Sequence, residues 1–367
     1  MTTAAARELA DILAGRSGHI GDPAVGWPAL LEVAAQHQLL SGLWSALHRQ
    51  GVPALPPALA AAKRSPLAIV SARHARNAER IADLGAQLDR ILDVLEVAGI
   101  DAIPFKGAHW LAAGLLPDPA AREMVDVDVL VPSSLADAAA EALARIGYRA
   151  EDAPADAEPT DHQLRPMSAP DRFGSVEVHV EPLVEFRRSL LQADELRDRA
   201  RVQIVDGMSR RVPDPTIAMV LLLGHAQLQE DGGRLLELPL RALHDLHELG
   251  PAFRAEVDWD EVVERFRRVG LGGRIALAGF AVAAHEYFEI DLPVPTTGGR
   301  SWLRATEEAM DRPALAATYR EAAYLPRALR AERMERLHGA GRGAPLWRAR
   351  LAHVATGVGR RLRRGGR

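Results

Sequence analysis

Residues 124–131 read MVDVDVLV, a run in which acidic and apolar side chains alternate with a period of two. This is the period of a β-strand, so Asp126 and Asp128 are predicted on one face and the valines from Val125 to Val131 on the other. The valine face can pack against helices. Two charges within a core strand are costly unless they are paired or bound. The run therefore predicts a sheet that carries a polar site.

The pattern around this strand changes twice along the chain. Apolar residues recur every three or four positions through residues 1–95, which predicts amphipathic helices. From residue 96 to about 213 strand and helix patterns alternate, with further strands predicted at GIDAIPFKG and RFGSVEVHVEPL and a hairpin at RVQIVDGMSRRVPD. After Pro215 the pattern is helical again. We predict an α+β fold, an α/β core with a small mixed sheet flanked by N- and C-terminal helical segments.

The amino-acid composition excludes several kinds of chemistry for this protein. The chain has no cysteine, which excludes disulfides, thiolate catalysis and cysteine-ligated zinc and favours a reducing compartment. The first sixteen residues, MTTAAARELADILAGR, do not resemble a signal peptide, and no run approaches eighteen uncharged apolar residues. We therefore expect a cytoplasmic protein without a membrane span.

The net charge of −4 hides an asymmetry. Twelve arginines between Arg327 and Arg367 face only Glu332 and Glu335, so this tail carries +10 and the remaining chain −14. A tail of this kind can contact an acidic partner or surface, although a solvated helix is the commoner explanation. Few aromatic residues are interleaved with the arginines, so a nucleic-acid partner is not expected.

Two neighbouring motifs strengthen the case for a metal site at Asp126 and Asp128, because alone such a pair is also typical of a strand with one solvated face. In FKGAHW a predicted strand turns into a helix at Gly107, where backbone N–H groups favour a phosphate and Lys106 adds a cation. Arg122 lies just upstream of the strand. Oxygen ligands of this type suit Mg²⁺ or Mn²⁺.

The second motif is VEVHVE, which also alternates and places Glu177, His179 and Glu181 on one face. If this strand pairs beside the aspartate strand, Glu177 can supply a third carboxylate. Whether Glu177 or His179 approaches the metal stays open from the sequence.

The stretches FKGAHWLAAGLLPDPAAREMVDVDVLV, GYR and VEVHVEPL resemble the nucleotidyltransferases of the DNA-polymerase-β superfamily. More narrowly, they are similar to an uncharacterised bacterial nucleotidyltransferase family with a lysine-glycine turn and an arginine before its aspartate strand. GHAQLQ, LRALHDLHEL and VDWDEVVERFRRVG resemble that family's helical C-terminal part, so the likeness covers roughly residues 75–295. The superfamily's usual turn is Gly-Gly or Gly-Ser, and here Lys106 precedes Gly107.

The resemblance implies roles for the residues singled out above. Asp126 and Asp128 would be paired metal ligands, and Glu177 the third acidic residue, which helps to activate the acceptor hydroxyl. Gly107 would lie under the nucleotide phosphates. The implied organisation is a helical segment at 1–95, a nucleotidyltransferase core at 96–213, a helical domain closing the cleft at 214–300, and a helical segment with the basic tail at 301–367.

The predicted function is Mg²⁺-dependent transfer of a nucleoside monophosphate from an NTP to a hydroxyl of a small molecule, peptide or protein. One alternative is a catalytically weak nucleotide-binding or interaction module, such as a toxin–antitoxin component. Another is a metal-dependent phosphohydrolase that uses the same carboxylates. His225, in an apolar helix, is interpreted as a core histidine, and Arg241 and Asp245 as a local ion pair one helical turn apart.

Overall fold

The computed structural model describes residues 2–17, 26–52, 65–152, 161–184, 187–205, 207–229, 231–314 and 316–320. The chain forms two compact units, Met1–Asp311 and Arg312–Arg367. In the second unit, residues 313–314 and 316–320 are helical, and most of the predicted basic tail lies outside the described residues. The first unit contains the sheet and all the helices discussed below.

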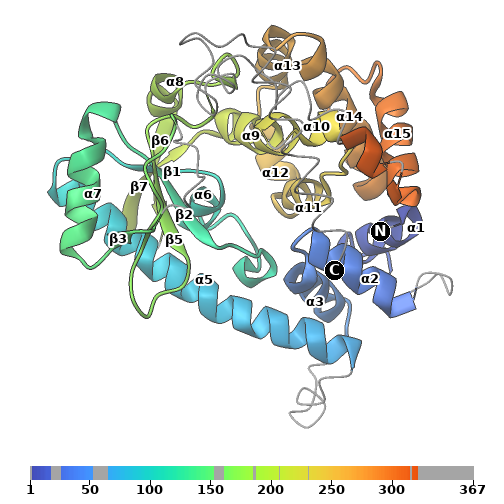
Figure 1. The fold of residues 1–367 in the computed structure, drawn as a ribbon, viewed down its shortest axis with the longest axis horizontal. Coiled ribbons are helices and arrows are strands. Elements are labelled where there is room, and N and C mark those ends of the chain that lie inside the picture. Colours follow the sequence, from blue (N-terminus) through green and yellow to red (C-terminus); the bar gives the residue numbers. More distant parts are fainter. Residues whose placement is uncertain are drawn as a thin grey trace, which may run out of the picture. The chain divides into compact units, whose positions relative to one another are not determined.

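A five-stranded sheet has the order β1-β2-β5-β4-β3 (Figure 1). Its strands are β1 Ile103–Pro104, β2 Asp126–Leu130, β3 Arg149–Ala150, β4 Met167–Ser168 and β5 Ser175–His179. The central pair β2–β5 is parallel, whereas β1–β2, β4–β5 and β3–β4 are antiparallel. The prediction of an α+β fold with a small mixed sheet is confirmed.

Parallel pairing of β2 and β5 requires a crossover connection between them. This connection contains the 3₁₀ turn η2, Ser133–Leu135, the helix α7, Ala136–Arg145, and the short strands β3 and β4. Ser133 and Ser134 lie in the 3₁₀ turn, and Leu135 is the N-cap of α7. Gly147 follows the helix with φ +104°, a conformation that glycine adopts without steric cost.

The helices predicted for the N-terminal segment are α1 Thr3–Leu13, α2 Gly26–Gln36, α3 Leu40–Arg49 and α5 Pro66–Val97. The long helix α5 contacts α3 near its start and α7 and β2 further along (Figure 1). Its buried face includes Leu84, Leu88 and Ile91, which share a core with Val127 and Val129 of β2. The apolar periodicity of α5 therefore has a direct cause, since it covers one face of the sheet.

Smaller elements surround the sheet. They are α6 Gly107–Ala112, the 3₁₀ turn η1 Pro119–Ala121, α8 Ala193–Asp198, β6 Ala200–Val205 and β7 Met208–Pro213. The last two strands pair antiparallel, as the predicted hairpin requires, and β7 contacts β1. Asp206, which belongs to the segment of the predicted hairpin, lies outside the described residues.

The chain after Pro213 is helical, as predicted. Its elements are α9 Pro215–Gly224, the π-helical turn η4 His225–Gln229, α10 Gly232–Leu235, α11 Leu240–Glu248, α12 Gly250–Ala255, α13 Trp259–Arg268, α14 Leu271–Phe288 and α15 Gly299–Asp311. These helices share one core with α1 and α3, in which Leu9 and Leu43 join Phe280 and Tyr287. The two ends of the first unit thus meet. Among the described residues no helix is long and apolar enough to cross a membrane.

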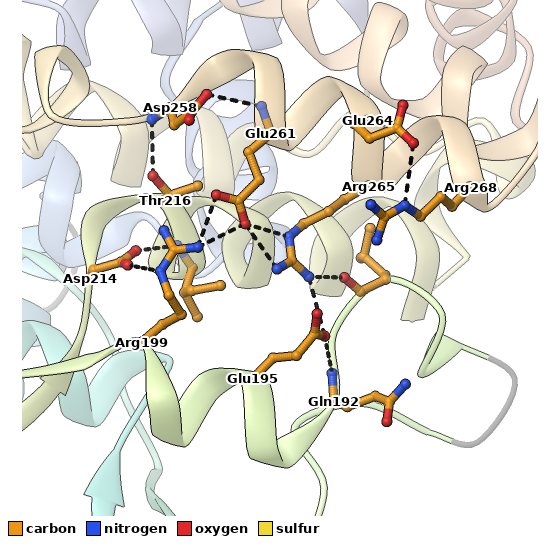
Figure 2. A network of polar contacts seen from close by, with 12 residues as sticks. Gln192, Glu195, Arg199, Asp214, Thr216, Asp258, Glu261, Glu264, Arg265 and Arg268 are labelled. Atoms are coloured by element: carbon orange, nitrogen blue, oxygen red, sulfur yellow. Dashed lines mark hydrogen bonds and ion pairs between the residues drawn. The ribbon is translucent and has the colours of Figure 1, made fainter.

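A chain of ion pairs connects α8 and Arg199, which follows it, with the C-terminal helices (Figure 2). Arg199 donates to Asp214 at 2.6 Å and to Glu261 of α13 at 2.9 Å. Arg265, whose side chain is only 8% exposed, donates to Glu261, to Glu195 of α8 and to the backbone carbonyl of Leu190. Buried charges are tolerated where they are paired and hydrogen-bonded, so this network fixes α13 against the segment that follows the sheet.

Candidate active site

The parallel pairing of β2 and β5 places Asp128 directly opposite Glu177 and Leu130 opposite His179. Side chains at matching positions of neighbouring strands share a face of the sheet, so the acidic residues of the two strands are brought together. On the other face Val127, Val129 and Val131 are fully buried. Val125 differs from the prediction, because it precedes the strand and is 57% exposed.

Asp128 is the centre of the polar cluster. Its Oδ1 atom accepts hydrogen bonds from Lys106 Nζ at 2.7 Å and from His179 Nε2 at 2.8 Å. His179 Nε2 also lies 3.3 Å from Glu177 Oε2. Asp128 is only 2% exposed, so the solvated strand face considered from the sequence does not apply to it. The cluster is enclosed and hydrogen-bonded.

Donor atoms of Asp128, Glu177 and His179 all lie within 4.8 Å of one another, close enough to hold one metal ion. Two of these donors are carboxylate oxygens, which Mg²⁺ and Mn²⁺ prefer. Asp126 stands outside this group, at the partly exposed start of β2, on the same face as Asp128. The structure thus brings three of the predicted acidic and histidine candidates together, with Asp126 at their edge.

The charges in the cluster shift the pKa values of its side chains. Burial, together with the charges of Asp128 and Glu177, raises the pKa of Asp126 to about 6. Burial alone would also raise the pKa of Asp128, but the adjacent Lys106 cation and the His179 hydrogen bond hold it well below its ordinary value. The hydrogen bond from His179 likewise lowers the pKa of Glu177. Asp128 and Glu177 are therefore ionised at neutral pH.

Lys106 and Gly107 form the turn between β1 and α6. Lys106 has φ +51° and ψ −127°, a combination that glycine adopts easily and lysine rarely. At Gly107 a Cβ atom would meet Arg122 Nη1 at 2.7 Å and Met124 Cε at 2.7 Å. A larger residue at position 107 would have to displace the ends of these arginine and methionine side chains, which pack directly on the glycine.

Arg122 lies against Gly107 and forms an ion pair with Asp245. Its Nε donates to both carboxylate oxygens of Asp245 in α11, at 3.1 and 3.2 Å, and its guanidinium carbon lies 5.8 Å from the ring centre of Trp110. Asp245 was expected to pair locally with Arg241, which instead donates to the backbone carbonyl of Glu123. Helix α11 is thereby tied to the segment that leads into β2.

The segment before β2 is fixed from a second side by α5. Arg73 donates to both carboxylate oxygens of buried Glu123, and the Asn77 amide donates to the backbone carbonyls of Ala120 and Arg122. These positioning residues were missed from the sequence. The signal in the sequence is that Arg122 and Glu123 are charged residues directly before a strand with two aspartates. A charged residue that is buried at this place needs partners from elsewhere in the chain.

His225 begins the π-helical turn. This geometry is rare in proteins overall, but where it occurs it is often at a functional site. Burial, reinforced by the nearby Lys106 charge, lowers the pKa of His225 to about 3, so its imidazole is neutral. His225 is partly buried, and a neutral imidazole is compatible with the predicted core histidine.

Comparison with known families supports the resemblance found in the sequence. The profile of a family described as uncharacterised nucleotidyltransferase matches residues 23–288, and the chain belongs to this family. The match extends beyond the expected likeness and includes the helices α2 and α3. Comparison with curated proteins gives no significant match, and neither does comparison with solved structures.

Proposed function

We propose that the protein transfers a nucleoside monophosphate from an NTP to a hydroxyl group of an acceptor, with release of pyrophosphate. The observation that carries the proposal is the in-register pairing of Asp128 and Glu177 on adjacent parallel strands, inside a nucleotidyltransferase family match. Clustered, ionised carboxylates would repel a triphosphate, so they suit this chemistry only when they hold cations.

The residues present fit a divalent cation of the Mg²⁺ or Mn²⁺ type. Asp126, Asp128 and Glu177 would hold it through oxygen atoms, and the enclosed position of Asp128 favours strong electrostatic interactions. When bound, such a cation polarises the attacking oxygen and neutralises charge on the leaving pyrophosphate.

The remaining side chains of the site have positioning and binding roles in this proposal. His179 donates to Asp128 and keeps that carboxylate beside Glu177. The guanidinium of Arg122, held against the Gly107 backbone by Asp245, supplies positive charge on the side of the turn where the phosphates would bind. Arginine suits this role because it stays charged and matches phosphate geometry.

Pyrophosphate release tests the proposal. The purified protein is incubated with each NTP, Mg²⁺ or Mn²⁺, and candidate small-molecule, peptide and protein acceptors, and adducts are identified by intact mass. We expect acceptor-dependent pyrophosphate release, lost in Glu177→Gln and in the double variant Asp126→Asn with Asp128→Asn. Asp83→Asn, which alters an acidic residue of α5 that binds Arg172, serves as the control and should retain activity.

The other outcomes separate the alternatives. Phosphate release without an acceptor would favour a phosphohydrolase. Nucleotide binding without turnover for any acceptor would favour a binding module, such as a toxin–antitoxin component. An NTP affinity that is unchanged in the double aspartate variant would contradict the metal site itself.

The compartment and further partners stay predictions. We propose a cytoplasmic location from the absence of cysteine in the chain. A contact of the basic tail with an acidic partner is a separate prediction, and the tail lies largely outside the described residues.

A further inference from the structure

Lys106 lies inside the carboxylate cluster rather than at its rim. Its Nζ atom is 2.7 Å from Asp128 Oδ1, and the side chain is only 19% exposed. Burial disfavours a charged lysine, but the charges of Asp128, Glu177 and Asp126 outweigh it and raise the pKa of Lys106. The ammonium group is therefore a permanent cation that neutralises part of the acidic cluster.

The backbone at Lys106 indicates that this side chain is there for its chemistry. With φ +51° and ψ −127°, position 106 has the geometry of the first central residue of a type II′ turn, which glycine favours. Strained residues of this kind persist where the surrounding structure holds them, commonly at functional sites. The strain at Lys106 coincides with the ion pair to Asp128.

Composition gives an independent indication. Lys106 and Lys63 are the two lysines among the chain's 45 basic residues, and all the others are arginines. Lysine carries a compact point charge with three donors, whereas arginine presents a wide planar fork. A compact charge is the one that can occupy a space suited to a single metal ion.

We propose that the Lys106 ammonium is the resident counter-cation of the carboxylate cluster, and that it leaves Asp128 when a divalent cation binds. This inference rests on the proposed function, because it assigns the metal to the same carboxylates. His179 bonds the same oxygen of Asp128 and stays in place, so the exchange involves one cation for another. A divalent ion must then compete with an internal charge, which weakens its binding in the absence of nucleotide.

Two consequences follow for variants of Lys106. Without the ammonium, the carboxylates attract a divalent ion without competition, so Lys106→Met should bind Mn²⁺ on the order of tenfold more tightly. The same variant without metal leaves the carboxylates to repel one another, so its melting temperature should fall and added metal should restore it. Lys106→Gly relieves the backbone strain and should nevertheless show both effects.

Nuclear magnetic resonance can follow the exchange directly, because the full-length protein has so few lysines. Labelling with [¹⁵Nζ]lysine should give two side-chain ammonium signals, and the one missing in Lys106→Met is assigned to Lys106. During titration with Mg²⁺ alone, we expect the Lys106 signal to shift strongly and the Lys63 signal to stay unchanged. A Lys106 signal that does not move at metal saturation would overturn the inference.

Metal affinity is measured separately, by calorimetry with Mg²⁺ and by electron paramagnetic resonance of free Mn²⁺, without nucleotide. Arg172→Met is the matched control, because it removes a cation from an ion pair with Asp83 away from the cluster. Tighter binding in Lys106→Met and Lys106→Gly, but not in the control, supports the exchange. Weaker binding in both would overturn it.

These measurements separate the two proposals. Metal binding by the unaltered protein with a stationary Lys106 signal contradicts only the exchange. If the unaltered protein and the Lys106 variants all fail to bind metal, the carboxylate site of the proposed function fails as well.

Discussion

Asp128 of β2 and Glu177 of β5 are register partners in the one parallel pair of the described sheet, and His179 Nε2 lies 2.8 Å from an oxygen of the former and 3.3 Å from an oxygen of the latter. A single imidazole thus contacts both carboxylates. Its other nitrogen, Nδ1, is buried without a hydrogen-bond partner among the described residues. This asymmetry decides how His179 is expected to act.

We predict that His179 positions the carboxylates and does not ligate the metal. Binding through Nε2 would move the ring proton to Nδ1, where no acceptor lies, whereas metal-bound histidines nearly always donate their second N–H. Pulsed electron paramagnetic resonance of the Mn²⁺-loaded protein should therefore show no directly coordinated nitrogen. His179→Gln should weaken Mn²⁺ binding about 10–100-fold. A nitrogen coupling that disappears in this variant would show that His179 is a ligand.

A side chain at position 107 is predicted to destabilise the protein. In Gly107→Ala the new Cβ would displace Arg122 and Met124, and we expect a loss of about 1–3 kcal/mol in the free energy of unfolding. Gly85→Ala is the matched control, because Gly85 lies within α5 with nothing near its Cβ position, and it should gain about 0.5–1 kcal/mol. Urea denaturation measures both. Equal changes in stability for the two variants would contradict the explanation that packing on Gly107 causes the loss.

The contributions of Arg122 and Asp245 to stability are predicted to depend strongly on each other. The two side chains are 13% and 5% exposed, so Asp245→Asn leaves a nearly buried guanidinium without its counter-charge, at a cost of about 3–5 kcal/mol. The double variant Arg122→Met with Asp245→Leu should be less destabilised than the sum of its single changes. A double-mutant cycle by urea denaturation checks this, and additive effects would contradict it.

Acid should destabilise the protein through buried histidine. Burial, with a smaller contribution from Arg201, lowers the pKa of His109 to about 3. Above pH 6.5 both folded and unfolded states leave this imidazole neutral. As the pH falls from about 6.5 towards 3, only the unfolded chain takes up the proton, so stability falls by up to about 1.4 kcal/mol per pH unit.

His109→Gln removes this titration, and its stability should decline less steeply than that of the unaltered protein between pH 6.5 and pH 4. Chemical denaturation at a series of pH values measures the slope. His285→Gln, which changes a histidine whose side chain is 54% exposed, is the control for replacing a histidine that is not buried. A His109 variant with an unchanged slope would refute the assignment.

The network of Figure 2 predicts that two arginines of α13, Arg265 and Arg268, contribute very differently to the stability of the protein. Arg265→Met removes a nearly buried cation from Glu261 and Glu195 and the donor to the Leu190 carbonyl, while Arg199 still pairs with Glu261, so it should cost about 1–3 kcal/mol. Arg268→Met removes only an exposed pair with Glu264 and should change stability by less than about 0.5 kcal/mol. Thermal and urea unfolding distinguish the two, and similar losses would show that burial does not decide the outcome.

Local patterns predicted much of the architecture. The period-two run at β2, the amphipathic face of α5 and the hairpin of β6 and β7 each depend on neighbours a few residues away, and all three are present. The residues at which the strands begin and end were predicted less accurately. Val125 continues the alternation but precedes the strand and faces outward, because pairing with β5 and not the sequence period decides where β2 begins.

The candidate site was predicted only as a set of residue types. MVDVDVLV and VEVHVE determined by themselves that acidic side chains would line one face of each strand, because alternation is a property of the extended backbone. Only the tertiary structure decided that the strands are adjacent and parallel, that Lys106 pairs with Asp128, and that Arg122 pairs with Asp245. These contacts join residues far apart in the chain, and the burial that makes them strong exists only after the helices and the sheet have packed.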